Sequence, residues 1–126
     1  MKLKIGKEDY ELNFGIAAID YLDNIYYVEQ DGFRFGQGIR ILMSKLLLSD
    51  PVAMYHAIKA GTVTLPSKPS NVDVETFLAG KFEKDEGEKF AEELMGELES
   101  APLTKTQAKG IRQDVEEVQK ELEKQA

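Results

Sequence analysis

Two short stretches near the N-terminus alternate polar and apolar residues, as half-buried β-strands do. Between them, Gly6-Lys7-Glu8-Asp9 is polar and contains a glycine, which is typical of a tight turn. Because successive side chains of a strand point to opposite faces, this pattern predicts an N-terminal β-hairpin with one apolar face. A lone hairpin is marginal in water, so this face is expected to pack on the rest of the chain. Its apolar positions are Leu3, Ile5, Tyr10, Leu12 and Phe14.

After Gly15 the apolar residues recur at gaps of three and four, which is the spacing of amphipathic helices. The first helix is expected to end near Glu29, before Asp31-Gly32. The second is apolar on most sides and is therefore the candidate central helix. The helices are expected over residues 16–29, 38–48, 51–60, 71–82, 90–100 and 108–122.

Helix boundaries are marked by residues that cap or interrupt helices. Asp50 can accept hydrogen bonds from the first amides of the third helix, and Pro51 suits a first turn, where no amide hydrogen is needed. Gly61 is expected to end that helix. The proline-containing stretch 62–71 then predicts a linker, closed by Ser70 or Asn71 as the next cap. The sequence thus predicts an α+β fold, with an N-terminal two-stranded β-hairpin packed on a mainly α-helical domain.

The last helix is highly charged and carries a narrow apolar seam, formed by Ala108, Ile111, Val115, Val118 and Leu122. The spacing resembles a coiled coil, but it spans only about two heptads. A helix this short is weakly populated alone in water, so the seam is expected to lie against its own domain or against another protein. We therefore divide the chain into a compact domain, residues 1–100, and a charged C-terminal helix or tail, residues 101–126.

Four aromatic residues surround the turn at Asp31-Gly32, namely Tyr26, Tyr27, Phe33 and Phe35. They either close one end of the core or contact a partner, since aromatic side chains and arginine are frequent interface anchors. Together with Ile111, Val115, Val118 and Leu122 of the seam, they are the candidate partner-binding residues.

The charge balance narrows the range of partners. The 126 residues include 23 acidic and 16 basic ones, a formal charge of −7. An acidic surface repels phosphate backbones, so no nucleic-acid partner is expected. The most apolar run is broken by Ser44 and Lys45 and is far shorter than a membrane span, so no membrane partner is expected either. The absence of cysteine fits a cytoplasmic protein.

Candidate catalytic and cofactor sites have simpler explanations. His56 is the only histidine and lies in an expected helix, with no GxSxG motif in the chain. Gly36-Gln37-Gly38 opens a helix but lacks the rest of a nucleotide-binding pattern. The acidic run 85–88 lacks the order of a calcium loop, and Asp20 with Asp23 resembles pairs that exposed helices carry routinely. We expect no enzyme activity, no cofactor and no metal.

The chain resembles the tail assembly chaperones of Gram-positive siphophages and prophages. The likeness rests on the strand Lys2-Leu3-Lys4-Ile5, the segment 10–15, the helix entered at Ile16, the turn 35–38 and Asp50-Pro51. The resemblance implies a small α+β chaperone that coats and solubilises the tape measure protein. It further implies recruitment of tail tube protein through a longer frameshifted form, possible self-association and a location in the bacterial host cytoplasm.

Two other functions compete with this one. A small acidic regulatory protein, an anti-repressor or a DNA mimic, would use its carboxylates to imitate phosphates. Lysine interleaved in the run 116–121 weakens that hypothesis, because mimicry requires a continuous negative face. An enzyme built on Asp20, Asp23 or His56 is the third hypothesis.

Overall fold

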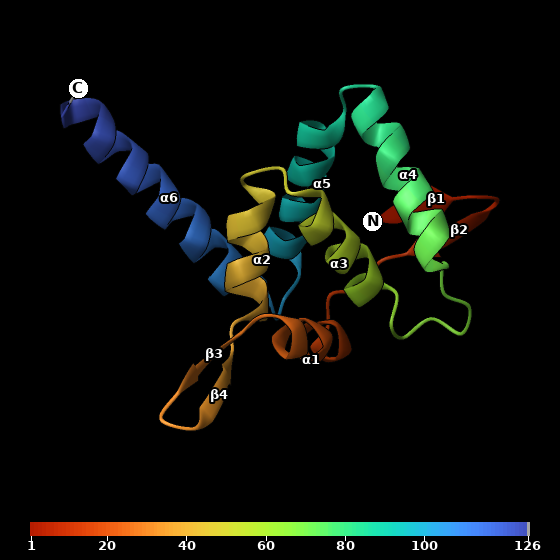
Figure 1. Ribbon diagram of the computed structural model, residues 1–126, viewed down its shortest axis with the longest axis horizontal. Helices are drawn as coiled ribbons and strands as arrows, with labels where there is room; N and C mark the ends of the chain where they lie inside the picture. Colours follow the sequence, from red (N-terminus) through yellow and green to blue (C-terminus); the bar gives the residue numbers. More distant parts are fainter. Residues whose placement is uncertain (126) are drawn as a thin grey trace.

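The computed structural model, described over residues 1–125, has two β-hairpins and six helices (Figure 1). The strands are β1 Lys2–Ile5, β2 Glu8–Glu11, β3 Tyr27–Gln30 and β4 Phe33–Gly36. The helices are α1 Ile16–Ile25, α2 Gly38–Leu46, α3 Pro51–Gly61, α4 Asn71–Glu83, α5 Gly87–Ser100 and α6 Lys105–Gln125. The α+β prediction, with an N-terminal hairpin on a helical domain, is confirmed.

The N-terminal hairpin packs its apolar face on the helices, as its alternating pattern predicts. In the antiparallel register Leu3 stands opposite Tyr10, and both are buried together with Ile5. Gly6 adopts a φ of 64°, a left-handed conformation that glycine reaches without steric cost. The hairpin therefore forms one wall of the core and lies beside α4 (Figure 1).

The centre of the core lies between α2, α3 and α5. Leu42, Met54 and Leu94, one from each helix, have no exposed surface. Complete burial of side chains of this size stabilises the fold by about 1.5–3 kcal/mol each. The candidate central helix is thus confirmed as part of this centre, with Ile39, Leu42, Met43 and Leu46 all buried.

The predicted helix caps at Asp50 and Ser70 are confirmed. The Asp50 carboxylate accepts hydrogen bonds from the amides of Val52 at 2.9 Å and Ala53 at 3.4 Å, and Pro51 occupies the first position of α3. The Ser70 hydroxyl accepts a bond from the Asp73 amide at 3.1 Å. These side chains satisfy amides that a helix leaves without a partner.

A different helix, α1, supplies the cap of α2. The first amide of α2, at Gly38, donates a 2.7 Å hydrogen bond to Oδ1 of Asp23. A Cβ at Gly36 would lie 2.5 Å from the Asp23 side chain, and one at Gly38 would lie 2.7 Å from that of Leu22. Both glycines are therefore required by the close approach of α1, which explains Gly36-Gln37-Gly38 without a nucleotide.

The prediction that the first helix runs to Glu29 is wrong, because α1 ends at Ile25 and residues 27–36 form a second hairpin. Tyr26 is already extended, with φ −112° and ψ 105°. Asp31 and Gly32 have φ values of 53° and 81°, and a two-residue turn with both φ values positive matches the right-handed twist of paired strands. The turn at Asp31-Gly32, with β-forming residues on either side, therefore favours a hairpin over the helix that the apolar spacing predicts.

The last helix, α6, packs on the body only through its first turns. Ala108 is buried and contacts are made with α2 and α5. Arg112 donates to Glu99 at 2.8 and 3.0 Å and to Glu92 at 3.2 and 3.3 Å. These carboxylates raise the pKa of Arg112 and fasten the helix to α5. Beyond Arg112, α6 extends away from the body (Figure 1).

The contact between Asp23 and α2 yields a stability prediction. Asp23→Ala removes the acceptor from a partly buried amide and is expected to lower the free energy of unfolding by about 1–2 kcal/mol. Asp20→Ala, an exposed change on the same helix, is expected to stay within about 0.5 kcal/mol. Urea unfolding measures both, and equal effects of the two substitutions would contradict the assignment.

Candidate interaction surfaces

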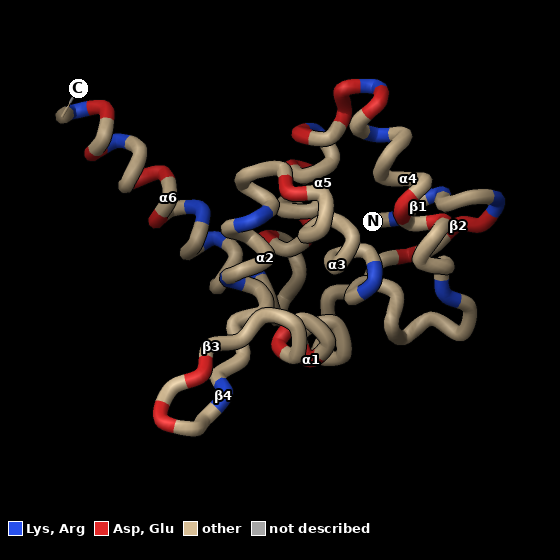
Figure 2. Tube along the Cα trace, viewed as in Figure 1, with Lys and Arg blue, Asp and Glu red and all other residues tan. Residues whose placement is uncertain are grey.

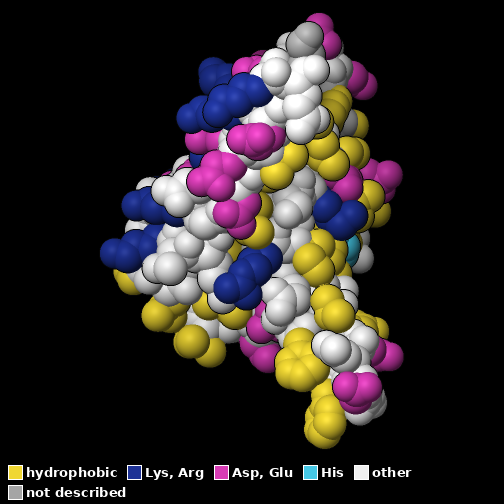
Figure 3. All heavy atoms as spheres, turned by 90° about the vertical axis from the view of Figure 1, so that its left-hand side faces the viewer, with side chains coloured by type: hydrophobic (Ala, Val, Ile, Leu, Met, Phe, Trp, Pro, Cys, Tyr) yellow, Lys and Arg dark blue, Asp and Glu magenta, His cyan; other side chains and the backbone are white. Residues whose placement is uncertain are grey.

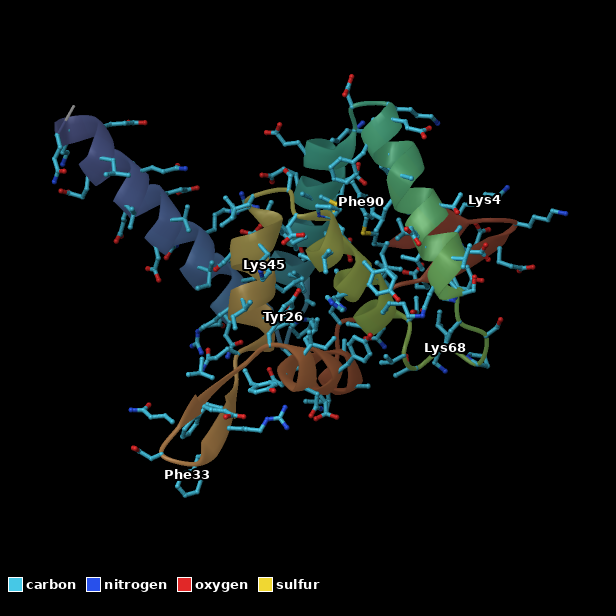
Figure 4. The ribbon with its side chains drawn as sticks, in the orientation of Figure 1. Lys4, Tyr26, Phe33, Lys45, Lys68 and Phe90 are labelled. Carbon is cyan, nitrogen blue, oxygen red and sulfur yellow. The ribbon has the colours of Figure 1, made fainter. Side chains whose placement is uncertain are left out.

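The β3–β4 hairpin has one apolar face, which we call the hairpin face, formed by Val28, Phe33 and Phe35. The register pairs Val28 with Phe35 and Gln30 with Phe33, and opposite residues of an antiparallel pair point to the same side. Val28 is 49%, Phe33 67% and Phe35 50% exposed. Figure 4 shows Phe33 at the tip, pointing away from the body. The predicted residues Phe33 and Phe35 therefore lie together in solvent.

The other face of this hairpin is polar and turned toward α1. The Arg34 guanidinium lies 3.8 Å from the centre of the Tyr27 ring, a cation–π contact. A shallow hollow between this face and α1 is lined by both residues and by Asp20, Asp23 and Asn24. This arrangement places Tyr27 apart from Phe33 and Phe35 and leaves the hairpin face directed outward.

Tyr26 anchors the base of the hairpin. Its amide donates to Leu22 O at 2.8 Å, and its carbonyl accepts from the Gln37 amide at 2.9 Å. The half-buried ring packs on the core and meets His56 edge-on, with ring centres 5.8 Å apart. Tyr26 therefore joins the base of the hairpin to the core and is not part of the exposed hairpin face.

The apolar seam of α6 is divided between two environments. Ala108 is buried, and Ile111 packs partly against the core of the same chain. Val118 and Leu122 are 60% and 62% exposed. We call residues Val115, Val118 and Leu122 the α6 stripe; Val115, at its inner end, is half-buried. Figure 3 shows hydrophobic side chains gathered on the hairpin and along the outer part of α6.

A groove between α3 and α4 is a third apolar surface, which sequence reasoning missed. It encloses about 430 Å³ and is lined by Pro51, Val52, Tyr55, Glu75, Leu78, Ala79 and Phe82. Glu75 is its one charged lining residue, while Val52 is 60% and Phe82 39% exposed. We call it the α3–α4 groove. Its signal in the sequence is a second apolar stripe on each helix, but only the fold brings the two stripes together.

His56 lies in an aromatic environment at the contact between α1 and α3. Its ring packs edge-on against Tyr26 and Tyr55, and its Nδ1 is buried with no hydrogen-bond partner in residues 1–125. Burial lowers the pKa of His56, and the negative charge of Asp50 opposes this only in part. The side chain is therefore neutral at pH 7 and packs, partly buried, between the two tyrosine rings.

Asp23 and Asp85, two of the residues considered above for chemistry, occupy structural positions in the fold. Among the described residues, no three His, Asp or Glu side chains lie close enough together to hold a metal ion. Asp23 caps α2, and Asp85 lies in the turn after α4 with a φ of 57°. No helix within residues 1–125 is long and apolar enough to cross a lipid bilayer.

The environment of His56 predicts a pH dependence of stability. Because its pKa is lower in the folded than in the unfolded protein, unfolding takes up a proton below about pH 6.5. Stability is therefore expected to fall as the pH drops through that value, and His56→Gln is expected to remove this component. NMR titration of the single imidazole measures its pKa directly, and a value at or above 6.5 would contradict the prediction.

Comparison with known proteins identifies a family whose members act on other proteins. No curated protein and no solved structure shows a significant match to the chain. A family model described as phage tail assembly chaperone protein, TAC, matches residues 2–113. That span includes both hairpins, the first five helices and the docked turns of α6. The chain therefore belongs to the phage tail assembly chaperone family.

Proposed function

We propose that this chaperone binds the tape measure protein of a phage tail through the hairpin face and keeps it soluble during tail assembly. The supporting observation is that Val28, Phe33 and Phe35 form an apolar surface that no other described part of the chain covers. A two-stranded hairpin is marginal by itself, and neither β3 nor β4 has a buried residue. A partner that covers this face would stabilise the hairpin as well as itself.

The chemistry of the hairpin face fits a long helical chain with a repeating apolar stripe. Burial of each large apolar side chain against a partner helix contributes about 1.5–3 kcal/mol, less where burial is incomplete. The outer edges of β3 and β4 also leave backbone groups unpaired, which an extended segment can use. The first contact requires apolar surface and the second requires free backbone groups, and neither requires a catalytic group.

The charge of the chain suits a coating protein. A net charge of −7 makes neighbouring copies repel one another unless they are held by a specific contact. A tape measure protein covered by such copies would stay dispersed in the host cytoplasm. Recruitment of tail tube subunits, through a longer frameshifted form, completes the proposed function, and mass spectrometry of infected cells would detect that form.

Membership in the chaperone family favours this function over the acidic regulatory protein. The charge pattern of α6 agrees, because Lys120 and Lys124 interrupt the carboxylates along the helix (Figure 2). A DNA mimic needs a continuous negative face to bind a basic partner.

Co-expression with the tape measure protein of the same phage tests the proposal. Phe33→Glu/Phe35→Glu is expected to reduce the co-purified tape measure protein at least about tenfold, because two charges replace apolar contacts at the centre of the face. Glu29→Gln, on the polar face of the same hairpin, is the matched control and is expected to bind normally.

Circular dichroism and thermal unfolding establish that the variants are folded, which is expected because both phenylalanines are exposed. Undiminished co-purification by the folded double variant would exclude the hairpin face as the binding surface. Failure of the unaltered chain to bind any tape measure protein would refute the proposed function itself.

A further inference from the structure

We propose that the α3–α4 groove is a docking site for a basic amphipathic helix of another protein, with one lysine or arginine of that helix paired with Glu75. The site is separate from the hairpin face, because the β3–β4 hairpin and α4 lie on opposite sides of the body (Figure 1). The two surfaces share no residue, so this inference does not rest on the proposed function. Both surfaces can be occupied at the same time.

The lining of the groove is apolar and reaches the solvent. Its volume of about 430 Å³ falls within the range of about 300–1,000 Å³ that is usual for binding sites. Val52 is 60% and Phe82 39% exposed, while Leu78 forms a buried part of the floor. Apolar side chains of a partner would remove this surface from water, which is favourable.

The walls of the groove fit a helix better than an extended segment. Both walls are helices, whose backbone groups are bonded internally. At the start of α3, Pro51 has no amide hydrogen and the Val52 amide already donates to Asp50 at 2.9 Å. An extended segment would therefore find no backbone partners here, whereas a helix satisfies its own amides and carbonyls and can pack between the two walls.

The charge of the groove favours a basic helix. Glu75 is the one charged residue of the lining, and its carboxylate forms no ion pair within residues 1–125. Two nearby lysines have other partners, since Lys45 lies 3.9 Å from Asp50 and Lys59 donates to Pro69 O at 3.2 Å. A cation of the partner would pair with Glu75, and a carboxylate at the same place would be repelled. The net charge of −7 also attracts a basic partner.

The position of Glu75 predicts the pattern of the partner helix. The α4 side of the lining extends from Glu75 to Phe82, which is about two turns or about 10 Å. An apolar stripe at positions i, i+3, i+4 and i+7 has the same length. The lysine or arginine therefore lies at one end of such a stripe. A contact of two turns buries much less than the roughly 1,600 Å² of a standard interface, so the affinity is expected to be in the range of tens of micromolar.

Synthetic peptides of about 16 residues, labelled for fluorescence anisotropy, test the site with the full chain. The probe is a helix rich in alanine and glutamine, with leucines at i, i+3, i+4 and i+7 and one lysine at the end of this stripe. One control has glutamine in place of the lysine. The other carries the lysine on the opposite face and keeps the net charge. The probe is expected to bind about three to five times more tightly than either control.

Substitutions in the chain assign this binding to the groove. Glu75→Gln is expected to remove the preference for the lysine probe, and Glu75→Lys is expected to reverse it in favour of a peptide with glutamate at that position. Val52→Glu is expected to weaken the binding of every peptide at least about tenfold, because it places a charge on the apolar lining. Ile16→Glu makes the same kind of change at an exposed position in the first turn of α1 and is expected to bind normally.

Circular dichroism establishes that the variants are folded, which is expected because all three substituted side chains are exposed. Equal binding of the probe and its controls, no binding of the probe, an unchanged preference in Glu75→Lys or undiminished binding by Val52→Glu would each overturn the proposal. The Phe33→Glu/Phe35→Glu chain keeps the groove intact and is expected to bind the probe normally. Loss of tape measure protein and loss of the peptide are therefore separate results.

Discussion

The hydrogen bond from the Gly38 amide to Asp23 is the contact that fixes where the second hairpin leaves the body. It joins the end of α1 to the start of α2, and the second hairpin is the segment between them. The bonds of Tyr26 close the base of the hairpin at the same place. The strands are thereby held firmly at one end while their apolar face stays in solvent.

The chain exposes apolar side chains at three separated places while its core is completely formed. Leu42, Met54 and Leu94 have no accessible surface, whereas Phe33, Val52 and Leu122 are each at least 60% exposed. Exposed apolar patches on a soluble protein usually mark contacts with other proteins. The net negative charge opposes nonspecific association between copies.

Local patterns in the sequence were sufficient for much of the fold. Asp50-Pro51 and Ser70 define helix starts through hydrogen bonds within one turn, and the N-terminal hairpin follows from its alternation. The second hairpin was missed because the helical spacing through Leu22 continues to Tyr26, although Asp31-Gly32 is a strong signal for a two-residue turn. The four aromatic residues were selected together from the sequence, but the structure separates them: Phe33 and Phe35 lie on the exposed face of the hairpin, while Tyr26 packs on the core. The α3–α4 groove was not predictable, because its two walls are separated by a linker and meet only in the folded chain.

Hydrogen–deuterium exchange of the chaperone, alone and in complex with the tape measure protein, tests the central claim most directly. In the free protein, amides of residues 27–36 are expected to exchange rapidly, because this hairpin has no buried residue. In the complex these amides are expected to become protected, while the core amides of α2 change little. A complex that forms without protection of residues 27–36 would contradict the account.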